Sequence, residues 1–183
     1  MRSFKYLSID TMKKFLLGFL LMGWGMQGQS LVQKWEGHFS YQYISAITSN
    51  ENTLITAADN AIFLYDTQTH QRTTLTTIEG LTGESISSLH FDNTNNQLIV
   101  GYENGMLSVY SFDDASIYTD VSIYNKTSLS NSKKRINAFE VFDNQLIISC
   151  DFGISIYNPT KKEFGDTYYF GANGNPLAVR QTV

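Results

Sequence analysis

The segment TLITAADNAIFLYD, residues 53–66, occurs in two further versions along the 183-residue chain. The second reads QLIVGYENGMLSVYS at residues 97–111, and the third reads QLIISCDFGISIYN at residues 145–158. Each version consists of a branched apolar stretch, a turn rich in Asp, Asn or Gly, and a second stretch with a tyrosine near its end. Because such turn residues tolerate positive φ, each version predicts a tight two-stranded β-hairpin.

The spacing of the three versions indicates which β-fold they build. Leu54, Leu98 and Leu146 correspond and lie 44 and 48 residues apart, which is typical of a propeller blade. Apolar stretches before and after each hairpin predict an inner and an outer strand, so each unit has four strands. The inner strands are expected at 44–48, 86–91 and 136–142, and the outer strands at 72–78, 119–124 and 167–170. We therefore expect an all-β propeller, since a plain β-sandwich does not explain three copies of one hairpin.

The blades are predicted near residues 42–82, 84–126 and 134–172 of a partial propeller that covers residues 30–183. Propeller rings have about four to eight blades, so three four-stranded blades make an incomplete ring. The tail at 173–183 is expected to lead into another inner strand. An open stack exposes an apolar blade face to water, and we therefore expect the isolated chain to be poorly soluble or oligomeric.

Residues 1–29 have the layout of a secretory signal peptide. An apolar run of eight, residues 15–22, follows two lysines and precedes small and polar residues. The run is too short to span a membrane. Met12 gives a more regular signal peptide than Met1, so it is an alternative start. We expect an exported protein that resides in the periplasm or at the cell surface.

Charge argues against a nucleic-acid partner. The whole chain has a net charge of −4, and removal of residues 1–29 leaves nine basic and sixteen acidic residues, or −7. The only basic run is Lys133-Lys134-Arg135. It is interpreted as a solvated loop between blades, with a contact for an anionic polymer such as a lipopolysaccharide sugar chain as the alternative.

The sequence offers little for catalysis or metal binding. Cys150 is the single cysteine and has no histidine spaced near it, so a buried hydrophobic role is expected rather than a nucleophile. The histidines at 38, 70 and 90 match no metal-binding motif. An EF-hand frame over Asp92, Thr94, Asn96 and Glu103 is rejected because its sixth position is not glycine and a predicted strand crosses it. No catalytic residue, metal or cofactor is therefore assigned, and the ligand-binding residues stay unknown.

A propeller hydrolase or lyase would need titratable groups that face a central channel from several blades. The predicted inner strands supply mainly hydroxyl and amide side chains, with one histidine and one carboxylate: Ser45, Thr48, Ser87, Ser88, His90, Asn137 and Glu140. This set does not favour an enzyme.

The opening segment WEGHFSY at 35–41 contains the pattern W-x-x-H-x-S-Y. It is interpreted as a first or closing strand, with a ligand site of His38 and the aromatic residues as the alternative. Together with AITSNENTLITAADNAIFLYD, EGLTGESISSLHFDNTNNQLIVGYENGMLSVY and FGISIYNPTKKEFGDTYYFGANG, this opening resembles the N-terminal propeller of the PorZ family of the Bacteroidetes type IX secretion system. The resemblance covers roughly residues 31–176.

The resemblance implies two seven-bladed propellers and a C-terminal secretion domain, of which this chain would hold part of the first propeller. It also implies a non-enzymatic component of the sortase-like attachment complex that works with PorU-, PorV- and PorQ-like proteins. The family is linked to the delivery of anionic lipopolysaccharide to cargo, and association with the membrane would be through partners only. The alternative is the periplasmic sensor propeller of a hybrid two-component regulator, whose turns have a similar style.

Overall fold

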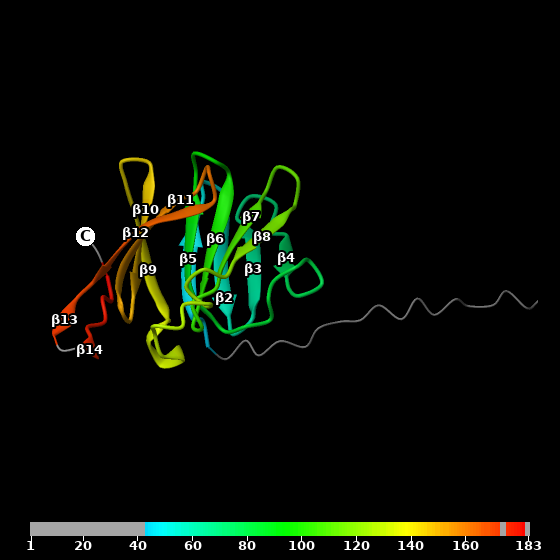
Figure 1. Cartoon of the computed structure of the whole chain (residues 1–183). Helices are drawn as coiled ribbons and strands as arrows, with labels where there is room; N and C mark the ends of the chain where they lie inside the picture. The colour runs from blue at the N-terminus through cyan, green and yellow to red at the C-terminus, as the bar shows by residue number, and fades with distance from the viewer. Residues whose placement is uncertain (1–42, 173–174, 182–183) are drawn as a thin grey trace, which may run out of the picture. The chain divides into compact units, whose positions relative to one another are not determined.

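The computed structural model describes residues 43–172 and 175–181, and it confirms the predicted propeller fold (Figure 1). Twelve of its strands form three four-stranded antiparallel sheets, here called blades 1, 2 and 3. Blade 1 has β1 (Ala46–Ser49), β2 (Thr53–Ala58), β3 (Ala61–Asp66) and β4 (Arg72–Leu75). Blade 2 has β5 (Ile86–Asp92), β6 (Gln97–Tyr102), β7 (Leu107–Ser111) and β8 (Ile117–Asp120). Blade 3 has β9 (Ile136–Phe142), β10 (Gln145–Cys150), β11 (Gly153–Asn158) and β12 (Glu163–Tyr169).

Within each blade the strands lie side by side in sequence order, as expected for a propeller. The three repeated hairpins share one register, in which the corresponding leucine and tyrosine are direct cross-strand partners. These partners are Leu54 and Tyr65, Leu98 and Tyr110, and Leu146 and Tyr157. A 3₁₀ turn, η1 (Asn131–Lys133), precedes blade 3, and a short hairpin of β13 (Gly171–Ala172) and β14 (Asn175–Pro176) follows it.

All three outer strands were predicted too far along the chain. In blade 3 the strand is β12, Glu163–Tyr169, rather than residues 167–170. In blade 1 the strand ends at Leu75, because the carboxylate of Glu79 accepts hydrogen bonds from the backbone and hydroxyl of Thr76 and forms a turn there. In blade 2 the strand is β8 rather than residues 119–124, since β7 pairs with residues 117–120. The apolar residue Ile123 lies in the following turn and is buried in the core instead.

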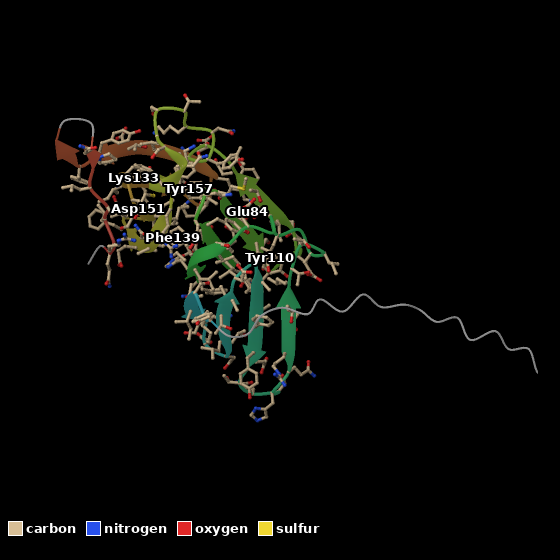
Figure 2. All side chains as sticks on the ribbon, turned by 90° about the horizontal axis from the view of Figure 1, so that it is seen from below. Glu84, Tyr110, Lys133, Phe139, Asp151 and Tyr157 are labelled. Carbon is tan, nitrogen blue, oxygen red and sulfur yellow. The ribbon has the colours of Figure 1, made fainter. Side chains whose placement is uncertain are left out.

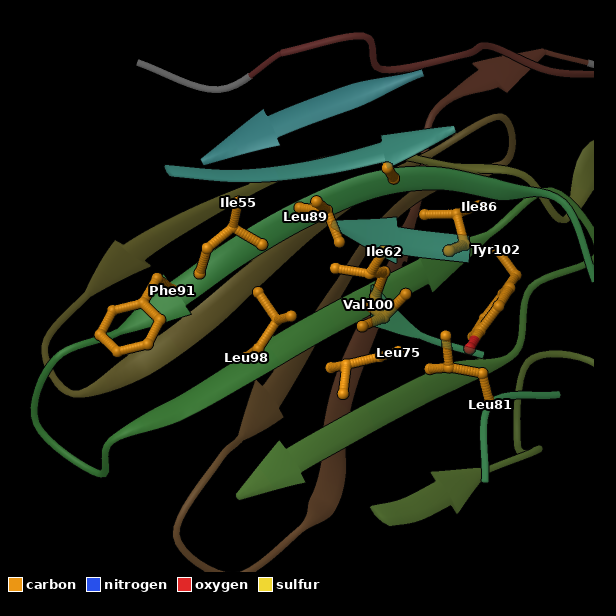
Figure 3. Close-up of a cluster of buried hydrophobic side chains, with 11 residues drawn as sticks. Ile55, Ile62, Leu75, Leu81, Ile86, Leu89, Phe91, Leu98, Val100 and Tyr102 are labelled. Carbon is orange, nitrogen blue, oxygen red and sulfur yellow. The ribbon is translucent and has the colours of Figure 1, made fainter. Parts of the chain in front are cut away.

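Each blade has two faces, because successive side chains of a strand point to opposite sides. We call the side turned toward the blade before it in the chain the preceding face, and the other side the following face. The first core joins the following face of blade 1 to the preceding face of blade 2, and Figure 3 shows it extending from Phe91 to Tyr102 and Leu81. Its buried residues are Ile55, Ala57, Ile62, Leu75, Leu81, Ile86, Leu89, Phe91, Leu98, Val100 and Tyr102.

The second core repeats this arrangement between blades 2 and 3. Its buried residues are Ile99, Leu107, Val109, Ile123, Ile136, Leu146, Ile148, Cys150, Phe152 and Tyr157. At Gly101 the two blades approach so closely that an added Cβ would lie 2.6 Å from Cγ2 of Ile136. Blade 2 is therefore covered on both faces by the same kind of apolar contact.

Polar contacts join the same ends of neighbouring blades. The turn between the second and third strands carries an acidic residue that bonds to the segment at the start of the next inner strand. Ser85 donates to Asp59 between blades 1 and 2, and Arg135 pairs with Glu103 between blades 2 and 3. Beyond blade 3, Arg180 pairs with Asp151 at 3.3 Å.

The predicted signal peptide and the opening segment at 35–41 lie outside the described residues. Within the part of the chain that the structure describes, no helix is long and apolar enough to cross a membrane.

Candidate functional site

Two polar residues of the inner strands, Ser87 and Asn137, make hydrogen bonds that reach beyond their own blade. Ser87 Oγ donates to the carbonyl oxygens of Gly101 at 3.2 Å and of Ile136 at 2.6 Å. In blade 3, Asn137 Nδ2 donates to Asp151 Oδ1 at 2.8 Å and to the carbonyl oxygen of Val179 at 2.9 Å. These side chains therefore tie the inner strands to neighbouring segments of the stack.

His90 is the inner-strand residue with the most distinctive surroundings. Its ring lies between blades 2 and 3, with its centroid 6.4 Å from that of Phe139. Burial lowers the pKa of His90, while the nearby charges of Asp92 and Glu140 act in the opposite direction. The ring borders a cavity of about 140 Å³ whose polar lining residues include Asn95, Asn144, Gln145 and Thr160.

Asp92 also borders this cavity, but its oxygens are engaged by the turn that follows β5. They accept hydrogen bonds from the backbone of Thr94 at 2.9 Å and of Asn95 at 3.3 Å, and from Nδ2 of Asn95 at 2.6 Å. The hydrogen bonds to its own turn hold the carboxylate of Asp92 in place beside the partly buried ring of His90.

The EF-hand frame is not formed. Asp92 ends β5, whereas Glu103 follows β6 at the opposite end of that strand and pairs with Arg135. Among the described residues, no group of three or more His, Cys, Asp or Glu side chains could hold a metal ion.

The basic run at 133–135 belongs mainly to the structure of the loop before blade 3. Lys134 is 5% exposed, and its Nζ donates to the carbonyl oxygen of Tyr124 at 2.6 Å and to Oδ1 of Asn131 at 3.1 Å. Arg135 pairs with Glu103. Lys133, labelled in Figure 2, is partly exposed, as is Arg135.

Cys150 is buried in the second core, and burial raises the pKa of its thiol. A thiol that resists ionisation is a poor nucleophile. Tyr157, labelled in Figure 2, lies in the same core. Burial raises its pKa, and its hydroxyl has no hydrogen-bond partner among the described residues.

Lysine–tyrosine contacts along blades 2 and 3 were not predicted from the sequence. Each places an ammonium group over a tyrosine ring that is more than a third exposed, a geometry that attracts cation and ring to one another. The pairs are Lys162 over Tyr118 at 5.4 Å, Lys134 over Tyr124 at 5.8 Å, and Lys126 over Tyr169 at 5.3 Å. The partners are 44, 10 and 43 residues apart, so no local motif could have indicated them.

The preceding face of blade 1 contains an apolar groove. It has a volume of about 570 Å³, and its lining includes Ile44, Leu54, Thr56, Tyr65 and Arg72. Leu54 is 38% exposed there, whereas its counterparts Leu98 and Leu146 are 0% and 1% exposed.

One protein family has a model that matches this chain: the N-terminal β-propeller domain of PorZ from the type IX secretion system, over residues 54–183. A search of curated proteins finds no match.

Solved structures show the same fold. A structure of PorZ, described as an essential bacterial surface component of the type IX secretion system of Porphyromonas gingivalis, has a TM-score of 0.64 and 15% identity. The match covers 74% of this chain and 18% of that PorZ chain. The extracellular domain of a protein assigned to the hybrid two-component systems of B. thetaiotaomicron has a TM-score of 0.58 and 22% identity, and the match covers 69% of this chain and 17% of that one. The computationally designed protein Ika4 has a TM-score of 0.53 and 19% identity over 77% of this chain and 79% of its own.

Proposed function

Because the chain belongs to the family of PorZ N-terminal β-propeller domains, we propose that it is a non-enzymatic binding module of a type IX secretion system. The observation that carries this proposal is the family match over residues 54–183, which extends from β2 through all of blades 2 and 3. The engaged polar groups of the inner strands support a binding role, because they leave no reactive constellation in the described part of the chain.

In its finer form, the proposal places the protein in the sortase-like attachment complex, with PorU-, PorV- and PorQ-like partners. It would be an exported protein, with residues 1–29 removed as a signal peptide, and it would reach the membrane through those partners. Anionic lipopolysaccharide is the proposed ligand class. The exposed lysine–tyrosine pairs support this choice, because they combine positive charge with flat apolar rings that can meet a sugar chain.

A sensor propeller of a hybrid two-component regulator is the second candidate. It is favoured by the structural likeness to such an extracellular domain, which is of nearly the same degree as the likeness to PorZ. The family match favours the secretion function over the sensor.

Deletion of the gene in its source organism separates the two candidates. For the secretion function, type IX cargo loses its attachment to the cell surface, and complementation with the gene restores it. For the sensor, cargo attachment is unchanged while transcription of a regulated gene set changes. Unchanged cargo attachment contradicts the proposal.

A further inference from the structure

The two internal interfaces of the stack are built from equivalent strands but differ in composition at one end. In blade 2, Phe91 is the cross-strand partner of Leu98. In blade 3, Val141 is the partner of Leu146, which corresponds to Leu98, so Val141 occupies the position of Phe91. Phe91 is 7% exposed, whereas Val141 is 51% exposed. The shorter valine side chain therefore does not fill the place that the phenylalanine ring fills between blades 1 and 2.

A second aromatic residue is exchanged at the same end. Phe112 comes two residues after the repeat tyrosine of blade 2, and Pro159 comes two residues after that of blade 3. In the first interface the rings of Phe91 and Phe112 pack edge to face, with their centroids 5.5 Å apart. Neither ring has an aromatic counterpart at its position in blade 3.

The cavity between blades 2 and 3 lies where these two rings are missing. Val141 and Pro159 line it, and so do Ile99 and Leu146 from the cores of the two facing blades. In the corresponding hollow between blades 1 and 2, Phe91 belongs to the lining, whereas the counterparts of these two core residues do not, among the residues that the structure describes. The ring of Phe91 thus closes the first interface, while the second stays open as far as the side chains of its core.

The cavity has the size of one aromatic ring. Its volume is about 140 Å³. A protein cavity of about 150 Å³ with an apolar lining binds benzene, whereas sites for drug-sized molecules measure about 300–1,000 Å³. The exposed side chains of Asn144, Gln145 and Thr160 lie at its border, where amide and hydroxyl groups can bond to peptide groups on either side of an inserted side chain.

We propose that this cavity binds one aromatic side chain of a partner polypeptide, in the place that Phe91 and Phe112 fill in the other interface. Aromatic side chains that fill such pockets contribute much of the binding energy of protein interfaces. All lining residues belong to blades 2 and 3 or to the turns within these blades, so both walls of the site are present in the described chain. The proposal does not rest on the secretion function.

A capped amino acid tests whether the cavity takes such a side chain. N-acetyl-phenylalaninamide is the probe, because it carries one phenyl ring between two peptide groups, and N-acetyl-alaninamide is its control. Saturation-transfer NMR with the purified chain measures the binding of each probe at millimolar concentration. We expect transfer to the ring protons of the phenylalanine probe and none to the alanine probe. Nuclear Overhauser contacts should join this ring to the methyl groups of Val141.

A filled cavity supplies the second arm of the test. Val141→Phe provides the missing ring from within the chain and should abolish transfer to the phenylalanine probe. Val121→Phe is the matched control, because Val121 is 37% exposed and lies outside the cavity, and it should bind the probe like the wild type.

Three results overturn the proposal: no transfer in the wild type, equal transfer in Val141→Phe and the wild type, or contacts of the probe ring to methyl groups outside the cavity. If Val141→Phe does not fold, the methyl contacts in the wild type decide alone.

Discussion

Blades 1 and 2 carry the same leucine–tyrosine pair at the same register, yet the two pairs lie in different surroundings. Leu98 of blade 2 is fully buried against blade 1, whereas Leu54 of blade 1 is 38% exposed. Their strands and hydrogen-bonded partners are alike. The difference shows that the burial of the repeated leucine depends on its position in the stack rather than on the repeat sequence itself.

The largest expected difference comes from removing the leucine of the repeat at two positions. Leu146→Ala leaves a cavity in the second core and should lower the free energy of unfolding by about 2–5 kcal/mol. Leu54→Ala removes a partly exposed side chain and should cost less than about 1.5 kcal/mol. Urea unfolding of both variants measures the two losses. Equal losses would show that the groove of blade 1 is as well covered as the internal interfaces.

A second test compares a glycine at the interface between blades 2 and 3 with a glycine that has no close neighbour. Gly101→Val should lower the free energy of unfolding by about 1–3 kcal/mol, because an added Cβ lies 2.6 Å from Cγ2 of Ile136 and 2.9 Å from Cζ of Phe139. Gly165→Ala on blade 3 is the control, since its nearest neighbouring atom is 3.8 Å away. Thermal unfolding compares the two. If Gly101→Val is as harmless as the control, blades 2 and 3 do not pack closely at this point.

The hairpins could be predicted because their evidence is local. Tyrosine and leucine recur at one spacing within each hairpin, and these residues became cross-strand partners in all three blades. The outer strand of blade 2 was placed wrongly because residues 121–124 are partly apolar. Ile123 packs into the second core from a turn. The pattern of a single sequence does not distinguish an apolar residue of this kind from one that belongs to a strand.

The contacts between blades could not be predicted, because they join residues that only the folded stack brings together. Arg135 pairs with Glu103 across 32 positions, and Lys134 turns into the loop to reach the carbonyl oxygen of Tyr124. From the sequence alone, both residues belong to a basic run at the surface. The cavity beside His90 could not be predicted for the same reason, because residues of two different blades line it.

The ion pair between blades is expected to contribute less than the cores. Glu103→Gln removes its charge, but the two side chains are 53% and 36% exposed, so we expect a loss of about 0–1 kcal/mol. Unfolding at low and at high salt measures this loss, which should shrink as salt screens the pair. A larger loss that does not respond to salt would mean that Glu103 stabilises the turn in another way.

The smallest effect concerns pH and distinguishes the interface of blades 2 and 3 from that of blades 1 and 2. Burial lowers the pKa of His90 below its ordinary value of 6.5, so the folded state binds this proton less readily than the unfolded state. The stabilising contribution of the His90 ring to folding is fully present at a pH above the pKa of this ring in the unfolded state. The contribution is lost as the pH falls below that value toward the lower pKa of the folded state. The free energy of unfolding should therefore decrease as the pH is lowered from neutrality, and that of the His90→Gln variant should decrease less.

Glu140→Gln removes a charge that favours the protonated ring of His90. The free energy of unfolding of this variant should therefore decrease more steeply with falling pH than that of the wild type. Parallel curves for all three proteins would mean that the cavity is wet enough to solvate the imidazolium, and the interface between blades 2 and 3 would then be looser on this side than the core beside it.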